Sequence, residues 1–255
     1  MNAPTKAPMN APAEWVPDAP EVGPIDAGPS DGGLDWTALE AHLREQLPAL
    51  RGELSVERFV RGGPHDAYRL RFGATLLVVR TFPALPEGLA DAHAALAQIA
   101  GSFDRAPAPL LLCEDAGVAG AAFQVLQYQP GFVITDRLPN AFVHEPDIGG
   151  RIADAVVDAL VELHTRPGGP VHGSFSLARC QFDADPEGGS PDRVTGVIGW
   201  DQARTNGSAA DDVRSLFASW PGEELGLPTG HDVVARYTAA YTATTGVAVD
   251  AADLT

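Results

Sequence analysis

Apolar residues recur at helical spacing in several stretches, and the clearest of them predicts a buried helix in the second half of the chain. Ile148, Ile152, Val156 and Leu160 fall on one face, and the stretch ends at His164. We expect this histidine to be packed in the core rather than to act as a catalytic base. Weaker patterns of the same kind predict further helices over 34–47, 86–100, 211–220 and 231–242.

Alternating and β-branched stretches predict an antiparallel sheet in the first half of the chain. The segment 67–72 alternates apolar and basic residues, and 75–80 is β-branched and apolar, with a glycine turn between them. Further strands are expected over 54–60, 110–113 and 122–128. Strands followed by helices in this arrangement predict an α+β fold.

Composition restricts the partners and the compartment that we expect. The 255-residue chain has a formal net charge of −17 and is 45% hydrophobic. Such an acidic surface repels nucleic acid and anionic membranes, so we expect neither as a partner. The two cysteines are far apart and predict reduced thiols, and no apolar run resembles a signal peptide or a membrane span. We therefore expect a cytoplasmic protein. Residues 1–33 are rich in Pro, Ala and Gly and predict a disordered tail.

Two segments near the middle of the second half carry the candidate chemistry. Residues 172–183 read HGSFSLARCQFD and residues 197–201 read VIGWD. Together they resemble the catalytic and metal loops of the aminoglycoside phosphotransferase family, whose patterns are H-G-D-x-x-x-x-N and I-D-W-[DE]. This resemblance spans roughly 34–220 and implies a bilobal, protein-kinase-like fold. It predicts an N-lobe over 34–130 with a small antiparallel sheet, and a mainly helical, shortened C-lobe over 131–255.

The resemblance also implies that three catalytic positions have changed. Ser174 stands where the family has the catalytic Asp, Arg179 where it has a metal-binding Asn, and Gly199 where it has a metal-binding Asp. A serine cannot accept the proton of a substrate hydroxyl at neutral pH. His172 is retained, but in the related kinases this residue mainly packs and braces the loop. We expect no bound metal, and the candidate substitutes for the lost ligands are Asp201 and Asp183.

Four positions in the N-lobe and hinge are expected to contact a ligand if the cleft binds one. Gly62 and Gly63 align with the turn over the phosphates, Arg80 with the cation on the third strand, and Tyr128 with the hinge. The resemblance implies a Glu partner for Arg80 on the helix that follows, but residues 91–100 contain no Glu, so we expect this arginine to be unpaired or to have another partner. Arg80, together with the C-x-D-x-x-x-x-G turn over 113–120, resembles the branch of the family associated with acyl-CoA dehydrogenases.

Three hypotheses follow. The first is a pseudokinase that binds a partner protein, a peptide or a small ligand in the inter-lobe cleft, in a biosynthetic pathway, with no cofactor. An alternative is an atypical ATP- and magnesium-dependent phosphotransferase acting on a small-molecule or peptide hydroxyl, with Asp201 or Asp183 as metal ligand. A second alternative is a repurposed lyase or cyclase that uses His172, Ser174 and Arg179. The sequence leaves the oligomeric state open.

Overall fold

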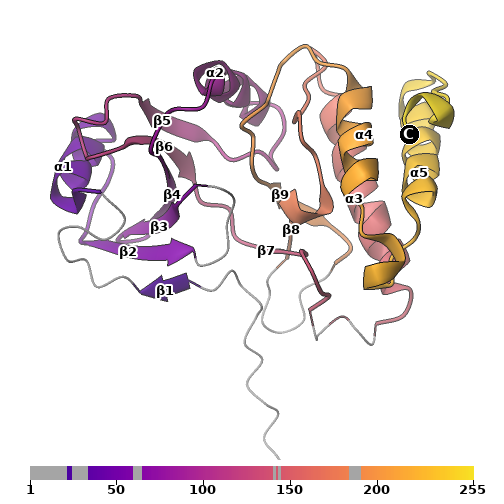
Figure 1. Cartoon of the computed structure of the whole chain (residues 1–255), viewed down its shortest axis with the longest axis horizontal. Helices are drawn as coiled ribbons and strands as arrows, with labels where there is room; N and C mark the ends of the chain where they lie inside the picture. Colours follow the sequence, from indigo (N-terminus) through magenta and orange to yellow (C-terminus); the bar gives the residue numbers. More distant parts are fainter. Residues whose placement is uncertain (1–21, 25–33, 60–64, 140–141, 143–144, 184–190) are drawn as a thin grey trace, which may run out of the picture.

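A six-stranded antiparallel sheet forms the centre of the first lobe in the computed structural model, which describes residues 22–24, 34–59, 65–139, 142, 145–183 and 191–255. Its strand order is β1-β2-β3-β4-β6-β5 (Figure 1). The strands are β1 (Val22–Pro24), β2 (Leu54–Phe59), β3 (Ala67–Phe72), β4 (Thr75–Phe82), β5 (Pro109–Cys113) and β6 (Ala122–Gln127).

Alternation along β4 divides the sheet into two different faces. Leu77 and Val79 are buried in the core formed with α1 (Trp36–Gln46), whereas Val78 packs against the core of the second lobe. Because successive side chains point to opposite faces of a strand, Arg80 shares the face of Val78 and is directed toward the second lobe. The same alternation that buries α1 against one face therefore places Arg80 in the cleft.

The second lobe is mainly helical, with α5 (Gly230–Thr245) packed against both α3 (Ile148–His164) and α4 (Ala209–Ser219). A three-stranded sheet of order β7-β8-β9 lies between these helices and the first lobe (Figure 1). Its strands are β7 (Phe132–Val133), β8 (Cys180–Phe182) and β9 (Val194–Val197). The chain passes from one sheet to the other through the hinge segment 128–131. The predicted α+β, bilobal architecture with a shortened helical lobe is confirmed.

The predicted helices and strands are found within three residues of their expected bounds, and the differences at α2 and at β1 have local reasons. Helix α2 (Leu89–Ala100) begins three residues later than predicted, because Gly88 has a left-handed backbone with φ of 77° and cannot continue a helix. Val22–Pro24 lie within the predicted disordered tail but form β1, paired with Glu57–Phe59 at the edge of the sheet. An exposed edge strand offers free backbone groups, and pairing with them gives this segment a position that its composition does not predict. The rest of the predicted tail lies outside the described residues.

Both cysteines are free and buried, as expected of reduced thiols. Within the described parts of the chain, no helix combines the length and apolar character needed to cross a bilayer.

Candidate functional site in the inter-lobe cleft

The buried carboxylate of Asp212, in the first turn of α4, holds the start of the 172–183 loop. Its Oδ2 accepts a hydrogen bond of 2.7 Å from the backbone N–H of His172, and its Oδ1 accepts one of 2.7 Å from that of Gly173. Nε2 of His164 lies 3.2 Å from Oδ2, and Nδ1 of His164 lies 2.9 Å from the hydroxyl of Tyr237. The prediction that His164 is a packed core histidine is confirmed.

The electrostatics of this anchor favour an ionised carboxylate. Burial raises the pKa of Asp212, but the hydrogen bond and charge of His164, together with the contacts of His172, outweigh burial and lower the pKa below its usual value. A carboxylate that accepts two backbone N–H groups fixes the loop in one conformation. The start of the loop is therefore positioned by packing of α3, α4 and α5 around one buried charge.

The imidazole of His172 braces the two motif loops against each other. It is fully buried, its Nε2 donates to the carbonyl of Ile198 at 3.0 Å, and its Nδ1 accepts from the N–H of Ser174 at 3.2 Å. Burial lowers the pKa of His172 to about 4, so the ring is neutral at neutral pH. Both ring nitrogens are occupied by the backbone, which leaves no nitrogen free to act as a general base. The hydroxyl oxygen of Ser174 is buried and has no hydrogen-bond partner among the described residues.

Arg179 and Gly199, the two residues that the resemblance predicts to stand at metal-ligand positions, are in direct contact. Nη1 of Arg179 donates to the carbonyl oxygen of Gly199 at 2.7 Å. Gly199 has φ of +82°, and a Cβ added there would overlap the Arg179 guanidinium. The space in which a side chain at position 199 would begin is therefore filled by a positive charge. Burial lowers the pKa of Arg179, and Asp201 and Arg80 act on it with opposite signs.

Arg80 crosses the cleft and pairs with Asp201. Its two terminal nitrogens contact the two carboxylate oxygens of Asp201, with Nη2 donating to Oδ2 at 2.8 Å. Burial raises the pKa of Asp201, but the hydrogen bond and charge of Arg80 outweigh it, with help from Arg179, and lower the pKa below its usual value. Of the two states expected for Arg80, unpaired or with another partner, the structure has the second.

A short relay of hydrogen bonds connects Arg80 to α2, the helix on which the resemblance implies a Glu partner. Nη1 of Arg80 donates to Oε1 of Gln124 at 3.4 Å, and Nε2 of Gln124 lies 3.0 Å from Nδ1 of His93 on α2. The burial of Gln124 on β6 keeps this amide in place. The sequence does not predict this relay; the one signal for it is that His93 lies four residues after Leu89 and three before Leu96, which places it on the apolar face of the helix.

The remaining predicted positions do not join the charged cluster formed by Arg80, Arg179 and Asp201. Gly62 and Gly63 lie outside the described residues. Asp183 is exposed just after β8, and among the described residues it makes no hydrogen bond or ion pair with the cluster. In the same parts of the chain, no group of three or more His, Cys, Asp or Glu residues is arranged to hold a metal ion.

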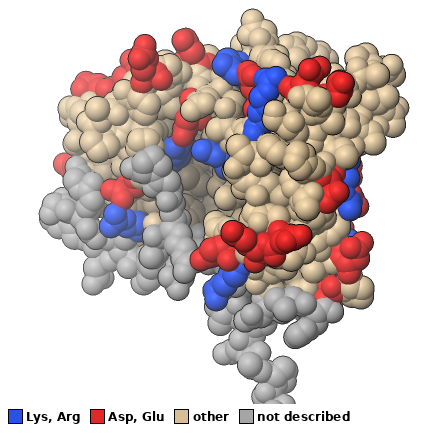
Figure 2. Space-filling model, turned by 45° about the vertical axis from the view of Figure 1, so that its right-hand side comes forward, with Lys and Arg blue, Asp and Glu red and all other residues tan. Residues whose placement is uncertain are grey.

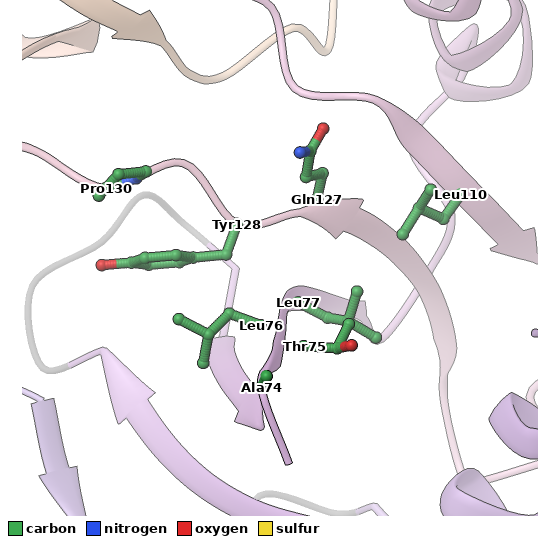
Figure 3. A pocket seen from close by; sticks show the side chains of 8 residues that line it. All are labelled: Ala74, Thr75, Leu76, Leu77, Leu110, Gln127, Tyr128 and Pro130. Carbon is green, nitrogen blue, oxygen red and sulfur yellow. The ribbon is translucent and has the colours of Figure 1, made fainter. Parts of the chain in front are cut away.

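Tyr128 lies in a pocket of about 430 Å³ next to the hinge. Figure 3 shows its ring beside Leu76 and Pro130, while Gln127 points away from them. The pocket is formed only by the first lobe and the hinge, and its walls are mainly apolar; the lining residues are Ala74, Thr75, Leu76, Leu77, Leu110, Gln127, Tyr128 and Pro130. Arg69 lies over the Tyr128 ring at 5.7 Å from its centre. Tyr128 is thus in a different place from the charged cluster. The hollow between the lobes, with basic side chains at its rim, is visible in Figure 2.

Comparison with known proteins identifies the family of this chain. Solved structures of similar shape include a candidate aminoglycoside phosphotransferase of Ralstonia eutropha, with a TM-score of 0.63 and 20% identity over 85% of this chain and 82% of that one. An aminoglycoside-3'-phosphotransferase of type VIII has a TM-score of 0.56 and 18% identity over 84% and 96%. The aminoglycoside phosphotransferase APH(4)-Ia has a TM-score of 0.52 and 14% identity over 83% and 85%. These identities support a common fold alone. No curated protein matches the chain. The profile described as the phosphotransferase enzyme family, APH, matches residues 55–187, and the chain belongs to this family.

Proposed function

We propose that this chain is a pseudokinase of the APH family, which binds a partner protein, a peptide or a small ligand in the inter-lobe cleft and does not carry out magnesium-dependent phosphoryl transfer. The observation that carries the proposal is the guanidinium of Arg179 beside Gly199. The retained fold with changed catalytic positions supports a binding role, and the resemblance of 113–120 supports a place in the branch associated with acyl-CoA dehydrogenases.

The residues present do not fit a magnesium ion at the family position. Two unit charges 4 Å apart interact by about 4 kcal/mol at an effective dielectric constant of 20, so a dication at that distance from Arg179 is repelled by roughly 8 kcal/mol. Magnesium also needs oxygen ligands, and neither Arg179 nor the side chain of Gly199 supplies one. Ser174 provides no carboxylate for the acceptor proton. Phosphoryl transfer needs a metal ion to neutralise charge and a carboxylate to accept the proton of the substrate hydroxyl. These positions supply neither the metal ligands nor the carboxylate.

The two enzymatic alternatives find less support in the same geometry. An atypical phosphotransferase needs Asp201 as a metal ligand, and both oxygens of Asp201 are engaged by Arg80. A lyase or cyclase built on His172 needs a ring nitrogen that can exchange a proton with a substrate. The imidazole is fully buried and holds two backbone groups, so it is poorly suited to that role.

Calorimetric titration of ATP with and without magnesium tests the proposal directly. We expect the wild-type protein to show no magnesium-dependent binding and no transfer of the γ-phosphate to water, small alcohols or peptides. A matched variant, Ser174→Asp/Arg179→Asn/Gly199→Asp, restores the family residues and serves as the positive comparison if it folds. Magnesium-dependent ATP binding by the wild type, abolished in Asp201→Ala, would replace the pseudokinase proposal with an atypical phosphotransferase.

A further inference from the structure

Arg179 is a partly buried cation that forms no salt bridge with an acidic residue in the part of the chain that the structure describes. Among the described residues its side chain makes one hydrogen bond, to the Gly199 carbonyl, and no salt bridge. The chain carries 34 acidic against 17 basic residues, so acidic partners are plentiful elsewhere on the surface. Removing a guanidinium from water without pairing it costs free energy, and such groups are normally paired.

The other charges around Arg179 neutralise each other. Asp201 and Arg80 are the charged groups that act on Arg179, and they are bound to each other through both carboxylate oxygens. His172, which also lies nearby, is neutral because it is buried. The cluster therefore carries one unbalanced positive charge. It needs one negative charge, and the carboxylate of Asp201 opposes the entry of a multiply charged anion.

The donors that remain on Arg179 match a flat oxyanion. Nη1 is used by the Gly199 carbonyl, which leaves Nε and Nη2 without acceptors among the described residues. These two N–H groups form the fork that binds the two oxygens of a carboxylate or phosphate in parallel. The buried Ser174 hydroxyl, which has no partner among the described residues, lies on the same loop, and the backbone N–H of Ser174 is linked to the Ile198 carbonyl through the imidazole of His172.

From this arrangement we infer that Arg179 replaces the magnesium ion of the family as the positive charge of the cleft, and that it binds a ligand bearing a singly charged oxyanion, such as a carboxylate, without any metal. This inference rests on the proposed non-catalytic function and assigns a chemical class to its ligand. A nucleoside triphosphate carries several more negative charges than the cluster can balance, so it is a poor ligand for this site in the absence of magnesium.

The experiment follows the Arg179 Nε–H signal and the Gly199 backbone amide by NMR in a buffer with EDTA. Sodium acetate and methyl phosphate are titrated as separate probes, with sodium chloride at equal ionic strength as the reference. We expect both signals to shift and saturate with acetate, with methyl phosphate at a pH that makes it a monoanion, or with both. The probe that binds more tightly shows whether the ligand's oxyanion is a carboxylate or a phosphate monoanion. ATP with EDTA is expected to bind more weakly than the probe that binds more tightly.

One variant separates the planar guanidinium fork of Arg179 from its charge, and a second variant serves as the control. Arg179→Lys keeps the charge but loses the planar fork, and we expect the Gly199 amide to report binding about tenfold weaker. Arg236→Lys makes the same change on α5, where Arg236 pairs with Asp154 at the surface, and should bind as the wild type does. The inference is overturned if acetate and methyl phosphate produce no saturable shift beyond that of chloride, or if Arg179→Lys titrates like wild type. Neither result depends on ATP and magnesium, so failure here is distinguishable from failure of the pseudokinase proposal.

Discussion

The guanidinium of Arg179 lies against Gly199, at the point where any other residue at position 199 would begin its side chain. The two positions come from different loops, 20 residues apart, and Arg179 also donates to the Gly199 carbonyl. Each residue therefore makes room for the other: the arginine needs a glycine, and the glycine leaves a space that the arginine fills. Arg179 and Gly199 therefore form a single packing unit.

This contact predicts that Gly199→Ala is destabilising and that part of the loss depends on Arg179. A non-glycine residue at φ of +82° costs about 1–3 kcal/mol, and the new methyl group also displaces the guanidinium. In Arg179→Ala/Gly199→Ala the displacement disappears and the backbone strain remains. Urea unfolding of the two single variants and the double variant should give a total smaller than the sum of the single effects, by about 0.5–1 kcal/mol. Simple additivity would show that the two residues do not interact energetically.

Asp212 is expected to be among the most sensitive positions in the chain. Its carboxylate is fully buried and accepts from the backbone of His172 and Gly173 while pairing with His164. Asp212→Ala leaves those buried donors unsatisfied, and we expect the free energy of unfolding to fall by about 3–5 kcal/mol. Chemical denaturation measures this change.

The neighbouring acid provides the matched control for that measurement. Asp211 lies on the same turn of α4 but is exposed, and its ion pairs with Arg204 and Arg214 lie at the surface. Asp211→Ala should cost less than about 1 kcal/mol. Equal losses at the two positions would indicate that the helix start, rather than the buried anchor, determines the effect.

The difference between what the sequence predicts and what it misses follows from the range of the interactions. Residues 148–164 form a helix with the predicted bounds because the apolar stripe is local and regular. The partner of Arg80 could not be predicted, because Gln124 and Asp201 lie 44 and 121 positions away and only the fold brings them together. The sequence predicts Asp201 as a candidate metal ligand, yet both of its carboxylate oxygens pair with Arg80. A three-residue strand such as β1 has no periodicity at all and depends on the edge to which it pairs.

Stability should decrease as the pH falls from about 6.5 to 4, partly through His172. In the unfolded chain this histidine takes up a proton near pH 6.5, whereas burial keeps its folded pKa at about 4. Between these values the unfolded state binds more protons, so stability rises with pH, by at most about 1.4 kcal/mol per pH unit from this residue. Burial lowers the pKa of His93 as well, which adds a contribution of the same sign.

Urea unfolding at pH 7.5, 6 and 5 checks this prediction. His172→Gln, which keeps a donor for the Ile198 carbonyl, should reduce the dependence on pH. An unaltered pH dependence in His172→Gln would mean that the buried imidazole does not contribute to the acid sensitivity.

The ion pair between Arg80 and Asp201 should hold the two lobes together. It is the bidentate contact from β4 to the 198–201 loop, with side chains 16% and 30% exposed. Since the pair is partly exposed, its coupling energy should be about 1 kcal/mol in a cycle of Arg80→Gln, Asp201→Asn and the double variant. In Arg80→Gln, the carboxylate of Asp201 can still pair with Arg179. In Asp201→Asn, Arg80 and Arg179 face each other without a carboxylate between them. We therefore expect Asp201→Asn to be the more destabilising of the two and to increase amide hydrogen exchange at Ile198 and Gly199.

The pair Arg69–Glu57, which joins two strands of one lobe, serves as the control, and Arg69→Gln should leave exchange in that loop unchanged. If Asp201→Asn protects the loop as well as wild type does, the ion pair is not what fixes the lobes.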